Sequence, residues 1–220
     1  MDLGLIIQLG YVVAAGLFIF GLKMLGSPDT ARRGNGISAI GMLVAIVAAL
    51  LDQGIVQYEF ILGGMIAGGI IGAFAARTVA MTSMPEMVAL FNGVGGAASG
   101  LVGVAALSIA DGSFTYITII LSILIGGVTF TGSLVAYGKL SEIIGSGAVT
   151  FGGQKFVNGL IVIGILASAV MFVMDPTNTN MLYTVVGLSL LFGIMVVIPI
   201  GGADMPVAVS YTHLTLPTIR

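Results

Sequence analysis

The chain has 220 residues, of which 58% are hydrophobic and only 7% are charged, and its mean hydropathy is +1.17. This composition excludes a soluble globular domain and indicates a polytopic α-helical membrane protein. The net charge of −2, without a basic patch, gives no indication of nucleic-acid binding, and a sequence without cysteine has no disulfides or thiolate metal ligands.

Hydropathy predicts seven complete membrane spans and the start of an eighth. We therefore expect an all-α fold, a polytopic bundle of about seven or eight transmembrane helices. The second span is short, at about 17 residues. The predicted spans are roughly 3–25, 36–52, 58–76, 84–108, 114–138, 156–174 and 181–200, with an onset at 204.

The charged residues between the spans predict the orientation. Alternate connections carry all the basic residues except Arg220, namely Lys23, Arg32, Arg33, Arg77, Lys139 and Lys155. The remaining connections carry only acidic residues, namely Asp52, Glu59, Asp111 and Asp175. The positive-inside rule places the basic side in the cytoplasm, so we expect the N-terminus outside.

The fourth span opens on the most informative stretch of the sequence. Ser83 and Glu86 have the spacing of a capping box, and Pro85 suits the first turn of a helix. A related phrase begins at Asp204 and also opens a helix at the predicted cytoplasmic face. Each acid either caps its helix and complements the helix dipole, or marks the cytoplasmic mouth of a path through the membrane or a contact with a soluble domain there.

Polar side chains inside the predicted spans are the other candidates, because such groups are costly in lipid. Asn92 lies two turns inside the fourth span, and Thr129, Thr131 and Ser133 lie near the end of the fifth. Asn92 either joins two helices by a hydrogen bond or lines a path for protons or ions. The hydroxyls either bond back to their own helix or line the same path.

Glycines recur at helical spacing in the third and fourth spans. They permit close approach of helix backbones, and they could alternatively leave room for water beside Asn92. They are Gly63, Gly64, Gly68, Gly69 and Gly72, then Gly93, Gly95, Gly96, Gly100 and Gly103.

The last ten residues do not continue the apolar pattern. A span that begins at Asp204 should remain apolar for about 20 residues, yet residues 211–220 are polar and β-branched and include a proline. We expect 1–210 to be one transmembrane domain and 211–220 to be a non-native tail. No role is therefore assigned to His213, the only histidine.

No catalytic, nucleotide-binding or metal-binding motif of a soluble enzyme is present. The sequence nevertheless resembles the membrane domain of the β subunit of proton-translocating NAD(P) transhydrogenase. The resemblance runs over essentially all of residues 1–210. It rests on the phrases Met84-Pro85-Glu86-Met87-Val88-Ala89, Thr131-Gly132-Ser133-Leu134-Val135-Ala136-Tyr137-Gly138-Lys139-Leu140 and Gly201-Gly202-Ala203-Asp204-Met205-Pro206-Val207.

The resemblance implies a proton-conducting part of an enzyme that transfers hydride from NADH to NADP⁺. Asn92 stands where many members have a membrane histidine, Asp204 matches the aspartate implicated in coupling, and Ser133 matches a serine near the path. Glu86 joins these as a proton-path or coupling residue. By resemblance we expect no cofactor bound by this segment, with NADP(H) and NAD(H) held by soluble domains of the complete enzyme.

The resemblance also implies the surroundings of the chain. They include an α subunit with its own membrane helices, an NADP(H)-binding domain at the cytoplasmic face, a dimer of complexes and a multi-pass location in the bacterial inner membrane. The sequence is then truncated before the NADP(H)-binding domain. Two other readings stay open: a stand-alone proton- or ion-coupled secondary transporter, suggested by the repeated Met-Pro-x-x-Val phrase, and a structural anchor without a path.

Overall fold

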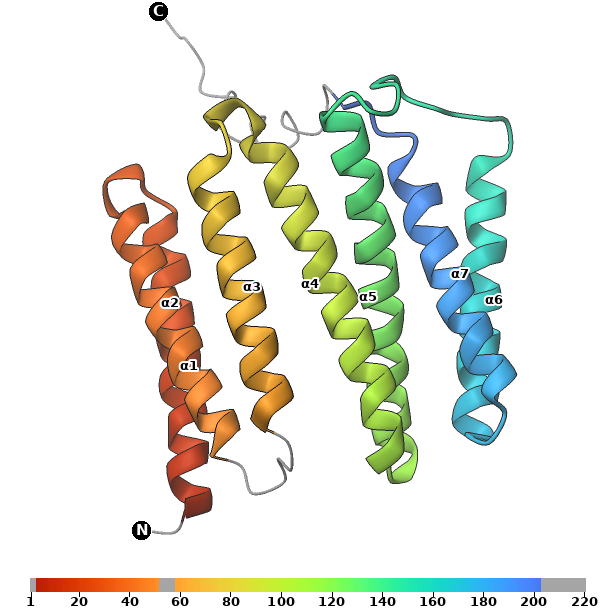
Figure 1. The fold of residues 1–220 in the computed structure, drawn as a ribbon. Coiled ribbons are helices and arrows are strands. Elements are labelled where there is room, and N and C mark those ends of the chain that lie inside the picture. Colours follow the sequence, from red (N-terminus) through yellow and green to blue (C-terminus); the bar gives the residue numbers. More distant parts are fainter. Residues whose placement is uncertain (1–2, 52–57, 203–220) are drawn as a thin grey trace, which may run out of the picture. The chain divides into compact units, whose positions relative to one another are not determined.

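The computed structural model describes residues 3–51 and 58–202, and every regular element in those ranges is helical. Seven α-helices there are long and apolar enough to cross a membrane (Figure 1). The seven complete predicted spans are therefore confirmed, whereas the predicted onset at 204 lies outside the described residues. The chain forms two compact units, Met1–Arg77 and Thr78–Arg220, called unit 1 and unit 2 below.

Unit 1 contains α1 (Leu3–Leu25), α2 (Pro28–Leu50) and α3 (Tyr58–Thr78). The first two form an antiparallel hairpin. A Cβ added at Gly34 would lie 2.8 Å from the carbonyl oxygen of Gly21, so the two backbones are in direct contact. Such close packing without side chains between helices is typical of glycine in membrane helices.

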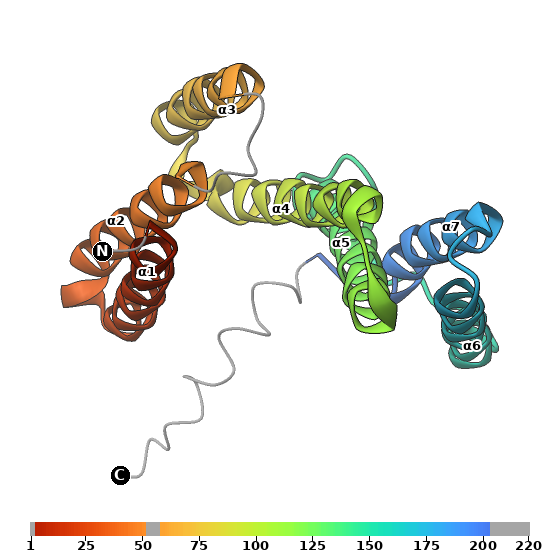
Figure 2. The same cartoon turned by 90° about the horizontal axis from the view of Figure 1, so that it is seen from below.

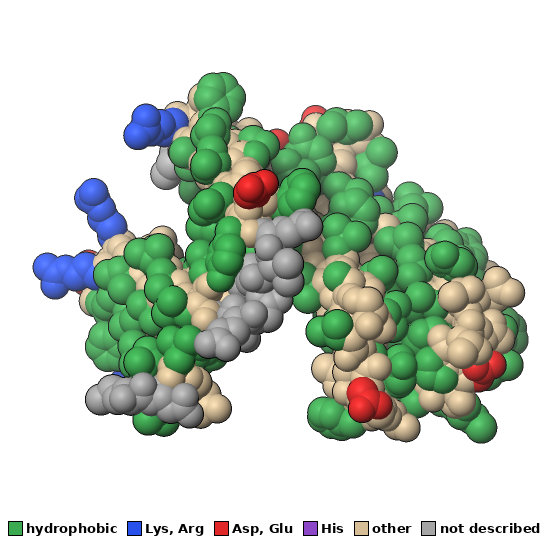
Figure 3. Space-filling model, turned by 60° about the horizontal axis from the view of Figure 1, so that its bottom comes forward, with side chains coloured by type: hydrophobic (Ala, Val, Ile, Leu, Met, Phe, Trp, Pro, Cys, Tyr) green, Lys and Arg blue, Asp and Glu red, His purple; other side chains and the backbone are tan. Residues whose placement is uncertain are grey.

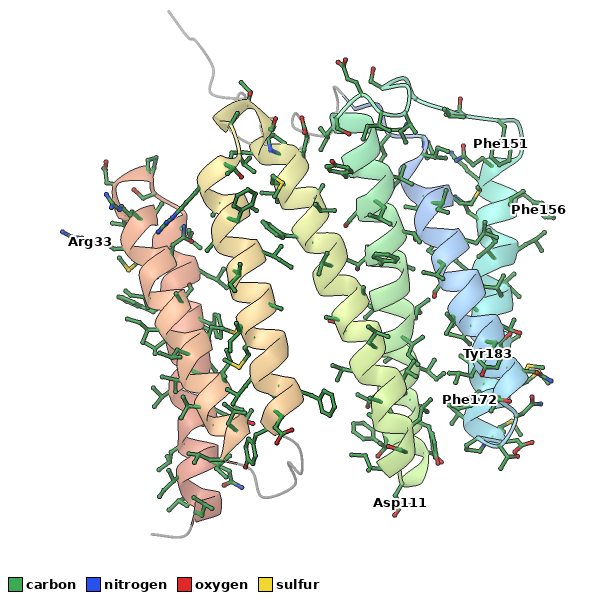
Figure 4. The ribbon with its side chains drawn as sticks, in the orientation of Figure 1. Arg33, Asp111, Phe151, Phe156, Phe172 and Tyr183 are labelled. Atoms are coloured by element: carbon green, nitrogen blue, oxygen red, sulfur yellow. The ribbon has the colours of Figure 1, made fainter. Side chains whose placement is uncertain are left out.

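The second helix is longer than predicted, with 23 residues in place of about 17, because it begins at Pro28 rather than near 36. Pro28 occupies the first helical turn, where its missing N–H leaves no hydrogen bond unmade. Arg32 and Arg33 lie in the opening turns, and Figure 4 shows Arg33 near the α1–α2 turn. The hydropathy profile excluded these turns because the two arginines lower the local hydropathy, and hydropathy does not detect the helix start at Pro28.

Unit 2 contains α4 (Met84–Ala106), α5 (Gly112–Leu140), α6 (Gln154–Met174) and α7 (Thr179–Val197), with 3₁₀ turns at Met81–Ser83 and Leu107–Ile109. Seen from below, the helices follow one another in the order α4, α5, α7, α6 (Figure 2). Residues later in α4 contact residues earlier in α5, whereas residues later in α5 contact residues later in α7. Helices α5 and α7 are therefore parallel neighbours, and α4 is antiparallel to α5.

Unit 2 has two distinct ends. We call the end where α4 and α6 begin and α5 and α7 finish the Lys139 end, and the opposite end the Asp111 end. Figure 4 shows Phe151 and Phe156 at the first and Asp111, Phe172 and Tyr183 at the second. Within unit 2 the bases Lys139 and Lys155 thus lie at one end and the acids Asp111 and Asp175 at the other, as the alternation of charges predicts.

The apolar core of unit 2 lies toward the Asp111 end. Phe172 and Val185 are 2% and 0% exposed and pack with a cluster of isoleucines on α5, Ile119, Ile120 and Ile123. Tyr116 meets the ring of Phe172 edge-on, with centroids 6.1 Å apart. On the outside, hydrophobic side chains cover most of the visible surface (Figure 3), as expected of helices that face lipid.

Candidate functional site

The structure brings two of the predicted site residues together. Asn92 on α4 donates a hydrogen bond from Nδ2 to Oγ of Ser133 on α5, with 2.8 Å between the two atoms. Ser133 is only 8% exposed, whereas Asn92 is exposed in this chain. The amide is therefore anchored by one helix partner and remains accessible to a further group.

Glycines allow α4 and α5 to approach closely enough for this bond. A Cβ added at Gly126 would lie 2.6 Å from both the Gly100 nitrogen and the Gly96 carbonyl oxygen. A Cβ at Gly93 would lie 3.1 Å from Cβ of Ser133, directly beside the polar pair. The close-packing interpretation of the fourth-span glycines is confirmed for these residues.

The polar pair lies inside the span and not at its surface. Asn92 comes eight residues after the first residue of α4, Met84, and Ser133 comes seven residues before the last residue of α5, Leu140. At about 1.5 Å per residue, both lie roughly 10–12 Å from the Lys139 end. A hydrocarbon core is about 30 Å thick, so an amide and a hydroxyl at this depth must find partners within the protein or in water.

The threonines of α5 do not extend the polar pair. Thr131 faces α7 and donates to the carbonyl oxygens of Leu190 (2.7 Å) and Gly127 (3.1 Å). Thr129 packs its Cβ and methyl against Gly96 of α4. The hydroxyl of Thr131 is thus committed to backbone acceptors, one on its own helix, as is common for threonine in membrane helices, and one on α7.

Glu86 is half-buried in the first turn of α4. The predicted capping box is wrong, because Ser83 makes no side-chain cap hydrogen bond. Ser83 closes a 3₁₀ turn with φ −94° and ψ 9°, which is not the extended conformation that a capping residue needs. Pro85, by contrast, does lie in the first turn as predicted.

Glu86 is six residues from Asn92 on α4, and among the described residues it bonds to neither Asn92 nor Ser133. Asp204 lies outside the described residues, as do His213 and the tail 211–220. The structure thus assembles one half of the predicted site, the Asn92–Ser133 pair. It places Glu86 about 9 Å along the helix from that pair.

A groove of about 240 Å³ lies further toward the Asp111 end than the polar pair, and neither Asn92 nor Ser133 is among its lining residues. It lies between α4, α5 and α7. Its lining is apolar except for Ser189, whose hydroxyl donates to the Val186 carbonyl oxygen of its own helix. The lining residues include Ala97, Leu101, Val104, Gly126, Phe130 and Ser189.

Lys139 is the residue whose role the sequence interpretation missed, since it served there only as a marker of the cytoplasmic side and as part of a phrase that carries the resemblance. It is 2% exposed, and its ammonium group donates to three backbone carbonyl oxygens. The sequence did contain a sign that Lys139 faces another helix, because it follows Gly132 by seven residues and so lies on the same helix face. Gly132 packs against Gly193 and Val197 of α7.

Among residues 3–51 and 58–202, no group of three or more acidic, histidine or cysteine side chains could hold a metal ion.

Comparison with known proteins agrees with this picture. A family model described as NAD(P) transhydrogenase beta subunit matches residues 7–215. Two sequences of NAD(P) transhydrogenase subunit beta from Rhodospirillum rubrum are each 37% identical over 212 residues, covering 91% of this chain and 45% of the relative. The chain thus spans just under half the length of these relatives.

Proposed function

This chain belongs to the NAD(P) transhydrogenase beta subunit family, and we propose that it forms the proton-conducting membrane part of that enzyme. In this proposal, protons that move inward through unit 2 drive hydride transfer from NADH to NADP⁺. The nucleotides bind to soluble domains outside this chain. The observation that carries the proposal is the Asn92–Ser133 hydrogen bond, a polar pair held about 10–12 Å inside an apolar span.

Asn92 and Ser133 act as lining groups of the path. An amide does not titrate, so Asn92 orients water and passes hydrogen bonds but does not carry the proton itself. One of its two N–H groups is used by Ser133, and its exposure leaves the rest of the amide accessible to water or to a group from another helix.

Glu86 and Asp204 act at the mouth of the path. Glu86 lies at the Lys139 end, and we assign this end to the cytoplasmic face, with the N-terminus outside, because the alternating charge supports that orientation. Protonation at this mouth would change the electrostatic field at a docked NADP(H)-binding domain and so shift its nucleotide affinity. Such coupling between two sites typically amounts to 5- to 150-fold in affinity.

The surroundings follow from the same proposal. The complete enzyme includes an α subunit that contributes membrane helices, and two such complexes form a dimer in the bacterial inner membrane. The NADP(H)-binding domain docks at the cytoplasmic face. Neither NAD(H) nor NADP(H) binds to the membrane part.

The test uses the intact enzyme in sealed vesicles, with reduction of an NADP⁺ analogue by NADH and internal pH followed together. We expect Asp204→Asn to lower the number of protons moved per hydride. Asp111→Asn is the matched control, because Asp111 is exposed at the opposite end. Proton flux that ignores the nucleotides would instead support a stand-alone transporter, and the absence of both activities would support a structural anchor.

A second pair of variants tests the path itself. Ser133→Ala removes the acceptor of the Asn92 bond, and we expect slower proton movement from assembled enzyme. Ser99→Ala is its control, because Ser99 is exposed on α4 and its hydroxyl donates to the Gly95 carbonyl oxygen of its own helix. Equal proton rates for the two variants would argue against a role for the polar pair.

A further inference from the structure

A buried ammonium group joins three segments at the Lys139 end. Lys139 Nζ donates to the carbonyl oxygen of Gly147, in the loop after α5, at 2.9 Å. It also donates to the carbonyl oxygens of Ile198, the residue directly after α7, and of Ile200, the latter at 2.9 Å. Since an ammonium has three donors, all of its hydrogen bonds are made within these segments.

Backbone hydrogen bonds also join the loop after α5 to the residues that follow α7, on either side of the lysine. The Val149 N–H donates to the Ile198 carbonyl oxygen at 3.2 Å, and the Gly202 N–H donates to the Ser146 carbonyl oxygen at 2.8 Å. Gly202 also lies against Lys139, since a Cβ there would be 3.0 Å from the Lys139 carbonyl oxygen. We call this cluster the exit clamp, and it consists of Lys139, Ser146, Gly147, Val149, Ile198, Ile200 and Gly202.

The chemistry of the clamp is not that of simple packing. A buried charge costs far more than a buried methionine or leucine of similar volume, which would fill the same space. The three carbonyls compensate that cost, and the ammonium lies at the C-terminal ends of two parallel helices, where the helix dipoles favour a cation. The clamp therefore depends on the charge of one side chain and holds α5 and α7 in fixed register at their ends.

We propose that Lys139 is a positioning residue for proton coupling. Its ammonium fixes the point at which the chain leaves α7, and thereby the start of the segment that contains Asp204. Asp204 follows Gly202 by two positions and lies outside the described residues. This inference rests on the proposed function, because it assigns Lys139 a role in transmitting protonation from the membrane part to the soluble domains.

The experiment uses the intact enzyme and four variants. Lys139→Met keeps the length and the apolar stem but removes the charge, and Lys155→Met is its control because Lys155 is exposed at the same end. Gly202→Ala perturbs the clamp more gently, by pressing a methyl group against the Lys139 carbonyl. Gly145→Ala is its control, because no atom lies within 4 Å of a Cβ built there.

Three quantities are measured: the amount of assembled complex, the number of protons moved per hydride in sealed vesicles, and the dissociation constant for NADP⁺. We expect assembled Lys139→Met and Gly202→Ala enzymes to move fewer protons per hydride. Their dissociation constants should shift by roughly 5-fold or more, the lower range of allosteric coupling. Both controls should match the wild type.

The outcomes separate this inference from the proposed function. If the wild-type enzyme couples proton movement to hydride transfer, and the clamp variants assemble and couple equally well, the role of Lys139 is overturned. The proposed function is then unaffected. Wild-type enzyme that moves no protons during hydride transfer would overturn the proposed function and this inference with it. If Lys139→Met fails to assemble, Gly202→Ala decides: normal coupling overturns the inference, and impaired coupling beside a normal Gly145→Ala enzyme supports it.

Discussion

Gly126→Ala should separate α4 from α5. The added Cβ would lie 2.6 Å from two backbone atoms of α4, whereas ordinary contact begins at 3.4 Å, so the helices must part locally by about 0.8 Å. Backbone atoms cannot rotate out of the way as a side chain can. Overpacking of this kind costs about 1–3 kcal/mol of the free energy of unfolding.

The matched control is Gly95→Ala on α4, where a Cβ meets nothing within 4 Å. Both substitutions replace glycine by alanine within a helix, so both receive the same gain in helix propensity, up to about 1 kcal/mol. The difference between the two variants therefore isolates the cost of the helix contact. Gly96→Ala should fall between them, since its contacts would be somewhat longer, 2.8 Å to Cβ of Thr129 and 3.0 Å to the Gly126 carbonyl oxygen.

The assay is thermal unfolding of the purified enzyme in detergent, followed by loss of the monodisperse species. A difference of 1–3 kcal/mol corresponds to a midpoint roughly 2–12 °C lower for Gly126→Ala than for Gly95→Ala. Equal midpoints for the two variants would refute the backbone contact between α4 and α5. They would also remove the explanation for how Asn92 reaches Ser133.

Three further predictions use the same unfolding assay. A double-mutant cycle of Asn92→Ala and Ser133→Ala should give a coupling free energy of about 0.6 kcal/mol and not more than about 1.7, and strict additivity would contradict the hydrogen bond between them. Glu142, at φ 58°, should be replaced more favourably by glycine than by alanine, by about 1 kcal/mol, and equal stabilities would show that its backbone is not left-handed. Asn158→Leu should be neutral or stabilising by up to about 3 kcal/mol, because Oδ1 is buried without a partner among the described residues. A loss above about 1 kcal/mol would mean that a group outside them satisfies this oxygen.

The sequence predicts helix number well because apolar length alone determines it. It predicts helix starts less well: the opening turns of α2 contain two arginines, so hydropathy excluded them although Pro28 marks the true start. The predicted capping box at Ser83 was wrong for a related reason. The S-x-x-E spacing says nothing of the 3₁₀ turn that places Ser83 in a non-extended conformation.

The site was predicted as separate residues and not as contacts. Asn92 and Ser133 stood out because polar groups in lipid are costly, but their pairing depends on the register between α4 and α5. That register is determined by which glycines face each other, Gly96 and Gly100 across from Gly126. Lys139 was misjudged because a lysine at the end of a span usually extends toward the headgroups, whereas here the end of α7 encloses it.

The exit clamp also imposes an order on biosynthesis. The ammonium of Lys139 and the carbonyl of Ile198 are 59 residues apart in the chain. At a synthesis rate of about 5–20 residues per second, Lys139 is made roughly 3–12 s before that acceptor exists. During this interval the side chain must find its hydrogen bonds among water and lipid headgroups. The register of α5 and α7 can therefore be completed only after the whole of α7 has been translated and inserted.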